Sequence, residues 1–130
     1  MVFKQKIDKE LVMGLFDLFK KKKELPDFSY VNSIEKAKEE CDKGILDRVL
    51  LIPTTFGGTE DESNMIYVPK AFKINKEGYD RIISQVAKRE NANTYECIPE
   101  YKNGSVVPFK VTMIVYKDGK EFKSNSITFW

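Results

Sequence analysis

A short acidic run is the part of this sequence whose side chains are best suited to chemistry. Glu60, Asp61 and Glu62 are consecutive, and hydroxyl and amide side chains flank them. Oxygen atoms of this kind bind calcium and magnesium ions, but three adjacent acids do not converge easily on one ion. Their spacing also differs from that of the alternating acids in the helix–loop–helix calcium site. We therefore predict no metal and no other cofactor, and interpret the run either as an ordinary solvated loop or as one that docks on a basic partner.

The same loop carries an aromatic side chain, Phe56, near its tip. The paired glycines Gly57 and Gly58 follow it and give the backbone freedom to move. They lack the lysine and the helix start of a phosphate-binding loop. Aromatic side chains often anchor protein interfaces, and acidic side chains favour basic partners. The predicted partner-binding residues are therefore Phe56, Glu60, Asp61 and Glu62.

The chain contains no histidine. This excludes serine and cysteine nucleophiles that depend on histidine, and it removes the side chain best suited to proton transfer near neutral pH. Because histidine is absent, we predict no catalytic residue. Carboxylates, lysines or tyrosines could still catalyse a reaction, so a small enzyme or ligand-binding domain with a carboxylate-lined pocket is the alternative.

Cysteine usage and charge limit the other classes of site. Cys41 and Cys97 do not have the spacing of a metal site or redox pair, so we expect two buried reduced thiols, with a disulfide as the alternative. The net charge is only +2, and nineteen lysines stand against three arginines. Nucleic-acid binders are more basic and favour arginine, so we predict no nucleic-acid partner.

Residues 1–25 form an amphipathic helical candidate with a basic end. Its aromatic and lysine side chains predict an alternative function at a membrane surface. The residues that would bind the membrane are Phe16, Phe19, Lys20, Lys21, Lys22 and Lys23. Docking on the domain itself or on a second copy is the other interpretation, and acids on the polar face favour it. No run of eighteen apolar residues and no signal peptide are present, so we expect a cytoplasmic protein.

Helices and short strands account for the middle of the chain. A helix is expected from a cap at Asn32 to a stop at Gly44, followed by strands at 47–53 and 64–69. A longer helix is expected after a cap at Asn75. The apolar stripe that should cover the sheet consists of Tyr79, Ile82, Ile83, Val86 and Ala87.

The stretch 105–116 is the most apolar and β-branched of the chain, and we predict that it is the central strand of a three-stranded antiparallel meander. A three-residue turn ending at Gly104 would pair Tyr95 with Val111. A two-residue turn at Asp118–Gly119 would follow, with a bulge near 124–126.

These elements predict a single α+β domain over residues 1–130. It would contain an antiparallel sheet of about five strands, with the helices packed on one face. The organisation is like that of many small bacterial α+β proteins, which is a likeness of architecture alone. We expect a non-catalytic protein-interaction module, for example an inhibitor or immunity-type protein with a basic partner. A homodimer is a further alternative, because self-association would hide the uncovered face of the sheet.

Overall fold

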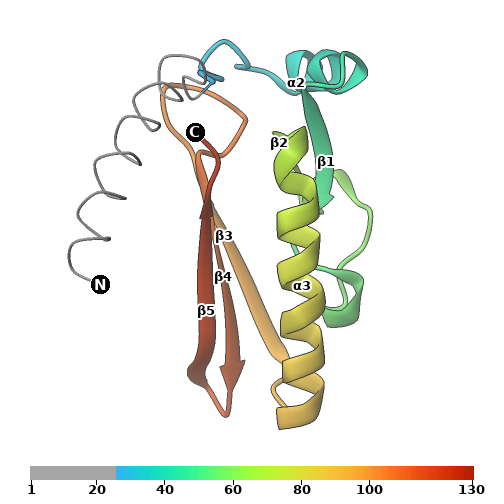
Figure 1. Cartoon of the computed structure of the whole chain (residues 1–130), viewed down its shortest axis with the longest axis vertical. Helices are drawn as coiled ribbons and strands as arrows, with labels where there is room; N and C mark the ends of the chain where they lie inside the picture. Colours follow the sequence, from blue (N-terminus) through green and yellow to red (C-terminus); the bar gives the residue numbers. More distant parts are fainter. Residues whose placement is uncertain (1–25) are drawn as a thin grey trace, which may run out of the picture.

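The computed structural model describes residues 26–130, drawn in colour in Figure 1. The predicted amphipathic helix of residues 1–25, with its membrane-binding side chains Phe16, Phe19 and Lys20 to Lys23, lies outside the described residues. The elements, in chain order, are α2 (Ile34–Asp42), β1 (Leu46–Leu50), the short 3-10 turns η1 (Thr54–Phe56) and η2 (Glu62–Asn64), β2 (Met65–Pro69), α3 (Lys70–Glu90), β3 (Thr94–Glu100), β4 (Lys110–Lys117) and β5 (Lys120–Thr128).

The fold is mixed α+β, and its sheets are antiparallel. The five strands are divided between two sheets, because β1 pairs only with β2 while β3, β4 and β5 form the meander. Figure 1 shows α3 running alongside both sheets. The ring of Phe72 meets that of Phe129 edge-on at 5.3 Å, which joins α3 to the end of the meander. The predictions of one five-stranded sheet and of helices packed on one face are not confirmed.

Helix α2 begins one residue later than predicted. Ser33, not Asn32, is the N-cap, and its hydroxyl accepts a hydrogen bond from the backbone N–H of Lys36. Serine is as good a cap as asparagine, so the sequence pattern alone could not choose between them. After the helix, Gly44 has a positive φ of 78°, as the predicted stop requires.

Helix α3 is longer than predicted, because it begins directly after Pro69. The predicted cap at Asn75 is wrong. Lys70 to Ile74 contain no helix breaker, so the helix continues through them to the end of the preceding strand. At its other end Asn91 has φ 57°, a left-handed conformation that closes many helices.

The buried face of α3 is rotated from the predicted stripe. Ile83 and Ala87 are buried as expected, but Ile82 is 53% exposed. The polar residues Lys76 and Asp80 take part of the space inside. The apolar pattern missed them because charged side chains are usually placed in solvent.

Strand β4 is the centre of the meander, as predicted, but it begins at Lys110. Residues 101–109 form a loop, because Ser105 is buried and bonds away from the sheet. Its hydroxyl donates to the Val31 carbonyl at 3.1 Å and accepts from the Val107 N–H at 3.0 Å. Pro108 has no backbone N–H, so it cannot donate a hydrogen bond to a neighbouring strand. The loop is therefore held by the segment before α2.

This loop changes the register of the meander. Tyr95 pairs with Val115, not with Val111, and Cys97 pairs with Met113. The predicted bulge exists, but it lies opposite Val115 and Tyr116, where Phe122 has no partner on β4. The partner of each residue on β3 is shifted by four residues along β4. Because four is an even number, every side chain stays on its predicted face of the sheet, and an apolar residue still faces the interior.

The core lies between α3 and the two sheets. The most deeply buried large side chains are Leu46, Val49, Tyr67, Val68, Val111, Met113, Val115 and Phe129. The C-terminal residue Trp130 is also buried, and its indole N–H donates to the carbonyls of Val107 and Pro108 at 3.3 and 3.1 Å. The loop 101–109 and the chain end therefore stabilise each other.

Candidate functional site

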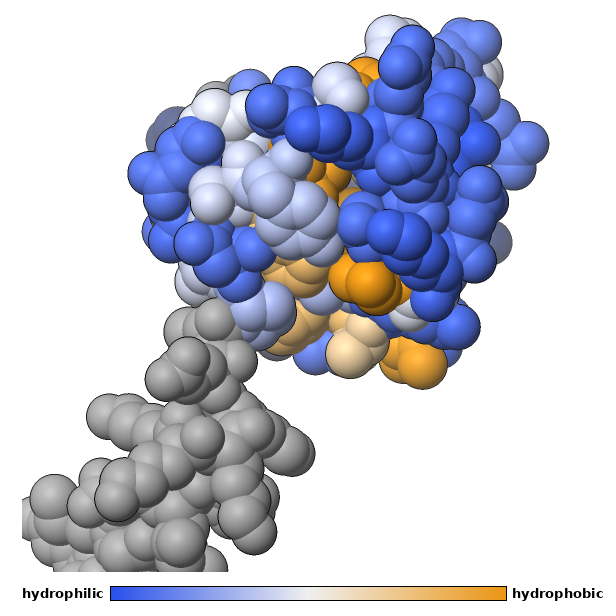
Figure 2. Space-filling model, turned by 90° about the horizontal axis from the view of Figure 1, so that it is seen from above, coloured by the Kyte–Doolittle hydropathy of each residue, from blue (hydrophilic) through white to orange (hydrophobic). Residues whose placement is uncertain are grey.

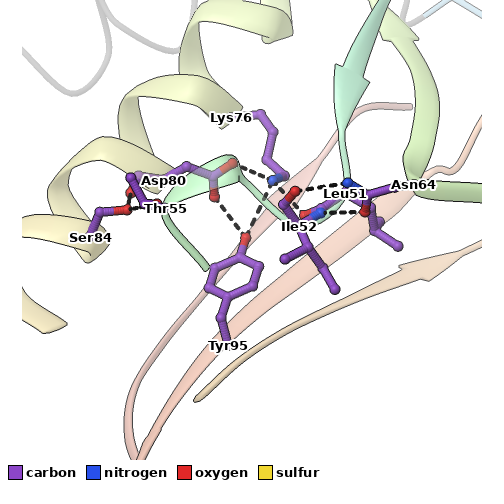
Figure 3. Close-up of polar contacts among 8 residues, drawn as sticks. All are labelled: Leu51, Ile52, Thr55, Asn64, Lys76, Asp80, Ser84 and Tyr95. Atoms are coloured by element: carbon purple, nitrogen blue, oxygen red, sulfur yellow. Dashed lines mark hydrogen bonds and ion pairs between the residues drawn. The ribbon is translucent and has the colours of Figure 1, made fainter. Parts of the chain in front are cut away.

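Three polar side chains meet inside the core, where α3 faces β3 (Figure 3). Lys76 and Asp80 are four residues apart on α3, so both point to the same side of the helix. The ammonium group of Lys76 lies 2.5 Å from Asp80 Oδ2, and the hydroxyl of Tyr95 donates to Asp80 Oδ1 at 2.7 Å. Lys76 is completely buried. These residues form the Lys76–Asp80–Tyr95 cluster.

The cluster satisfies its own hydrogen bonds. Lys76 also donates to the Leu51 carbonyl at 3.0 Å and to the Tyr95 hydroxyl at 3.3 Å. Burial raises the pKa of Asp80, although the positive charge of Lys76 opposes this. Burial and the nearby Asp80 carboxylate both raise the pKa of Tyr95, so its hydroxyl remains protonated. A group as deeply enclosed as Lys76 does not meet a substrate, and the cluster joins α3 to β3 and to the end of β1.

The cluster also supports the loop that contains η1. The ring of Phe56 stacks on that of Tyr95, with centroids 4.9 Å apart and planes 25° apart. Beside it, the hydroxyls of Thr55 and Ser84 are 2.6 Å apart, and Ser84 donates to the Asp80 carbonyl (Figure 3). The loop is thus attached to both β3 and α3.

Asn64 fixes the other end of this loop. Its side chain accepts from the Ile52 N–H and donates to the Ile52 carbonyl, both at 2.9 Å, and also donates to the Thr59 carbonyl. Gly58 passes so close that a Cβ there would lie 1.7 Å from the Ile52 carbonyl oxygen. Gly57 has φ 86°, which favours glycine. Both glycines therefore have a structural role.

A groove of about 690 Å³ lies between this loop and the C-terminal half of α3. Its lining consists of Thr55, Phe56, Gly57, Arg81, Ser84, Gln85, Ala87, Lys88, Ala92 and Asn93. Ala87 and Ala92 are buried, and their small side chains leave space that larger residues would fill. Concave sites of this size that combine apolar and polar side chains are typical of ligand binding. We name it the Phe56 groove.

The lining of the Phe56 groove contains two cations and no carboxylate. Arg81 and Lys88 are both exposed and lie about two turns apart on α3. Within residues 26–130 neither forms a salt bridge with an acid. The groove therefore combines an apolar wall at Phe56 with unneutralised positive charge.

The predicted partner-binding residues are not all in one place. Phe56 is half-buried and forms a wall of the groove, whereas none of the three acids lines it. Glu62 accepts from Arg48 at 3.1 Å and from the Tyr67 hydroxyl at 2.8 Å, and Asp61 accepts from Thr59. Burial, and after it the hydrogen bond that the Tyr67 hydroxyl donates to Glu62, raise the pKa of Tyr67 to about 12. Among the described residues, Glu60 is the acid of this run whose side chain forms no hydrogen bond and no salt bridge.

Glu60 lines a second, more polar groove of about 420 Å³. Two further carboxylates, from Asp47 and Glu77, line it together with Arg48 and Lys73. Lys73 lies 3.5 Å from Asp47, so part of this charge is neutralised. Across residues 26–130 no group of three or more acids and cysteines is arranged to hold a metal ion.

A third groove, of about 330 Å³, lies between α2, β2 and the loop 101–109. Its lining is Ile34, Met65, Ile66, Tyr67, Tyr101, Ser105 and Val106. Figure 2 views the molecule from above and shows apolar residues between larger polar areas. Burial raises the pKa of Tyr101, so its hydroxyl stays neutral there. This groove lacks a charged side chain and so lacks the electrostatic character of the Phe56 groove.

Both cysteines are free thiols. Cys97 is buried, as predicted, while Cys41 is half-buried. Burial raises the pKa of Cys97 to about 11 and also raises that of Cys41. Both thiols are therefore protonated near neutral pH, which makes them poor nucleophiles.

Sequence patterns alone do not identify the residues that build the site. Lys76 and Asp80 precede Ile83 and Ala87 on the same side of α3, and this charged pair within an apolar stripe was the available signal. The strand pattern predicts that Tyr95 pairs within the meander, but it does not indicate a partner for the hydroxyl of Tyr95. Arg81 and Lys88 carry no sequence signal, because they become neighbours of Phe56 only in the folded chain.

No protein-family model, no curated protein and no solved structure matches this chain. None of the helices within residues 26–130 has the length and apolar character needed to cross a membrane. The function must therefore be argued from the site itself.

Proposed function

We propose that this chain is a non-catalytic protein-interaction module, and that the Phe56 groove receives a large apolar side chain of the partner. The observation that carries the proposal is the groove of about 690 Å³ between the η1 loop and α3. Apolar side chains that enter such hollows often supply most of the affinity of an interface.

The charges at the groove indicate what lies beside that side chain. Arg81 and Lys88 are exposed, and within the described residues they have no acidic partner. A carboxylate next to the apolar group of the partner would neutralise them and fix its orientation. The occupant is therefore a segment of a protein that places a large apolar side chain next to an acid.

The acidic run provides a second contact on the same loop. Glu60 and Asp61 are exposed, and basic side chains of the partner would approach them. The partner would then carry a carboxylate near Arg81 and Lys88 and basic side chains near Glu60 and Asp61. An inhibitor or immunity-type role follows if the partner is an enzyme that loses activity when the groove is filled.

The buried polar cluster favours binding over catalysis. Lys76 and Asp80 are bonded to each other and to Tyr95, so their hydrogen-bonding capacity serves the structure. The raised pKa values of Tyr95 and Cys97 oppose a nucleophilic role for either.

Selection of peptides from a random library on the full chain tests the proposal. We expect enrichment of peptides with a large apolar residue next to Asp or Glu. Their affinity should fall at least tenfold with Phe56→Ala and with Arg81→Glu/Lys88→Glu. Selection of no peptide, or of peptides that bind these variants as well as the parent chain, would contradict it.

A variant that lacks the three acids, compared with the Arg81→Glu/Lys88→Glu variant, separates the contribution of the groove from that of the acidic run. Glu60→Ala/Asp61→Ala/Glu62→Ala removes the acids and leaves the groove lining intact. We expect this variant to retain the selected peptides. Lys120→Glu/Lys123→Glu, at two exposed residues of β5, is the matched control, because it reverses two positive charges as Arg81→Glu/Lys88→Glu does.

A further inference from the structure

Two isoleucines of α3 are exposed on the side of the helix that faces away from the core. Ile74 is 78% exposed and Ile82 is 53% exposed, and Gly78 lies midway between them. At about 100° per residue the three positions fall within roughly 80° of the helix surface, with Gly78 at the centre. The buried residue Ile83 is about 140° away from Gly78 by the same geometry. Ile74, Gly78 and Ile82 form the outer stripe of α3.

The fold of one chain does not require the glycine of the outer stripe. Gly78 lies within a 21-residue helix, and a Cβ built there would meet nothing within 4 Å. Glycine weakens the interior of a helix relative to alanine. It does, however, allow another backbone to approach closely. Gly78 and the two exposed isoleucines therefore indicate a surface that another helix can approach.

Charged side chains beside the stripe identify the partner helix. Glu77 and Arg81 lie on the same flank of the stripe, roughly 100° and 60° from Gly78. Within residues 26–130 neither has an oppositely charged group within 4.0 Å. When two identical helices cross in antiparallel directions at one residue, each flank meets the same flank of the other helix. Glu77 of each copy then lies beside Arg81 of the other.

We propose that the outer stripe of α3 binds a second copy of this chain, with the two α3 helices antiparallel and crossing at Gly78. Ile74 of each copy packs against Ile82 of the other, and two symmetry-related Glu77–Arg81 pairs flank them. The surface is self-complementary in both shape and charge, which a two-fold interface requires. A single helix pair buries a small area, so the dimer is weak and depends on concentration.

Sedimentation velocity of the full chain over a concentration series tests this dimer. We expect reversible dimers, and at least a tenfold increase in the dimer Kd for Ile74→Ser/Ile82→Ser and for Gly78→Leu. Ile98→Ser is the matched control, because Ile98 is 41% exposed and lies on β3, on the opposite face from the buried Tyr95 and Cys97. Circular dichroism confirms that each variant is folded.

Charge reversal tests the antiparallel arrangement. Glu77→Arg places two positive charges on the flank and Arg81→Glu places two negative charges there, so each variant should dimerise less than the parent chain. An equimolar mixture of the two should form heterodimers, because opposite charges then face each other at both pairs. Lys88→Glu alters the Phe56 groove without touching the stripe, and should leave the dimer Kd unchanged.

Several results would overturn the proposal. A parent chain that stays monomeric up to roughly 1 mM, the weakest range of specific association, would do so. A dimer that Ile74→Ser/Ile82→Ser leaves intact, or that Ile98→Ser weakens equally, would also do so. The groove proposal keeps its own test in Phe56→Ala, because Phe56 lines the groove and is not part of the outer stripe, whereas Arg81 belongs to both surfaces.

Discussion

Phe56 stacks on Tyr95 with ring centroids 4.9 Å apart, and the hydroxyl of the same tyrosine donates to Asp80 at 2.7 Å. Tyr95 therefore connects the wall of the Phe56 groove to the buried charge pair on α3. The ring supports the loop, and the hydroxyl joins β3 to the helix. Substitutions at Tyr95 and its neighbours can separate these two roles.

Tyr95→Phe removes the hydroxyl and retains the ring. Asp80 Oδ1 then loses its donor inside the core, so we expect the free energy of unfolding to fall by about 1–3 kcal/mol. Peptide affinity at the groove should change little, because the stacking on Phe56 remains. Urea unfolding and peptide titration measure the two effects. A variant as stable as the parent chain would show that the bond to Asp80 contributes nothing.

Lys76→Met leaves the Asp80 carboxylate without its cation. A buried charge that loses its partner destabilises a protein strongly, so we expect a loss of about 3–5 kcal/mol by urea unfolding. Lys76→Met/Asp80→Leu removes both charges and should recover most of that loss. Lys73→Met is the control, because its ion pair with Asp47 is about one-third exposed and should contribute at most about 1 kcal/mol. Equal losses for Lys73→Met and Lys76→Met would contradict this account of the cluster.

Two glycine-to-alanine substitutions should have effects of opposite sign. Gly58→Ala places a Cβ against the Ile52 carbonyl, so the loop must move, and we expect a loss of about 1–3 kcal/mol. Gly78→Ala meets no atom within 4 Å and improves the helix, so the folded monomer should gain up to about 1 kcal/mol. Thermal unfolding at low protein concentration, where the chain is monomeric, checks both. A gain in stability for Gly58→Ala would show that the loop accommodates the extra methyl group, and a loss for Gly78→Ala would contradict the expected gain in the helix.

Stability should decline in alkaline solution. Burial raises the pKa of Cys97 from 9.0 to about 11 and that of Tyr67 from 10.0 to about 12. The folded chain therefore keeps two protons that the unfolded chain releases, so unfolding becomes more favourable as pH rises. The stability that these groups contribute is complete below about pH 9 and is lost progressively towards pH 12.

Unfolding free energies measured between about pH 8 and pH 11 check this dependence. Cys97→Ala should remove the earlier part of the decline, and Tyr67→Phe the later part. For the parent chain we expect little change up to about pH 9 and a negative slope from there to about pH 11. A stability that stays constant or rises between these pH values would contradict the assignment of both groups as buried and protonated.

The positions of most elements were predictable because each depends on local chemistry. Strand β2 differs from its prediction by one residue, and α2 ends before Gly44 as expected. The central position of β4 follows from its β-branched content and from the turn signals on both sides. Antiparallel pairing then follows from the short connections.

The register and the site were not predictable, because they depend on contacts between distant residues. Ser105 leaves the strand pattern to bond Val31, which lies 74 positions earlier. The apolar pattern of α3 predicts Ile82 inside, but the Lys76–Asp80–Tyr95 cluster occupies the interior instead. A charged pair becomes stable in a core only when the fold supplies its hydrogen bonds, which the sequence pattern does not record.

The central claim is that the Phe56 groove binds an apolar group that carries a carboxylate. The most direct test is a titration of the ¹⁵N-labelled full chain with N-acetylphenylalanine, followed by two-dimensional NMR. We predict saturable shifts of the Gly57, Lys88 and Ala92 amides, with weaker shifts for the uncharged N-acetylphenylalaninamide. Unchanged amides at these three positions, or equal shifts for both compounds, would contradict the claim.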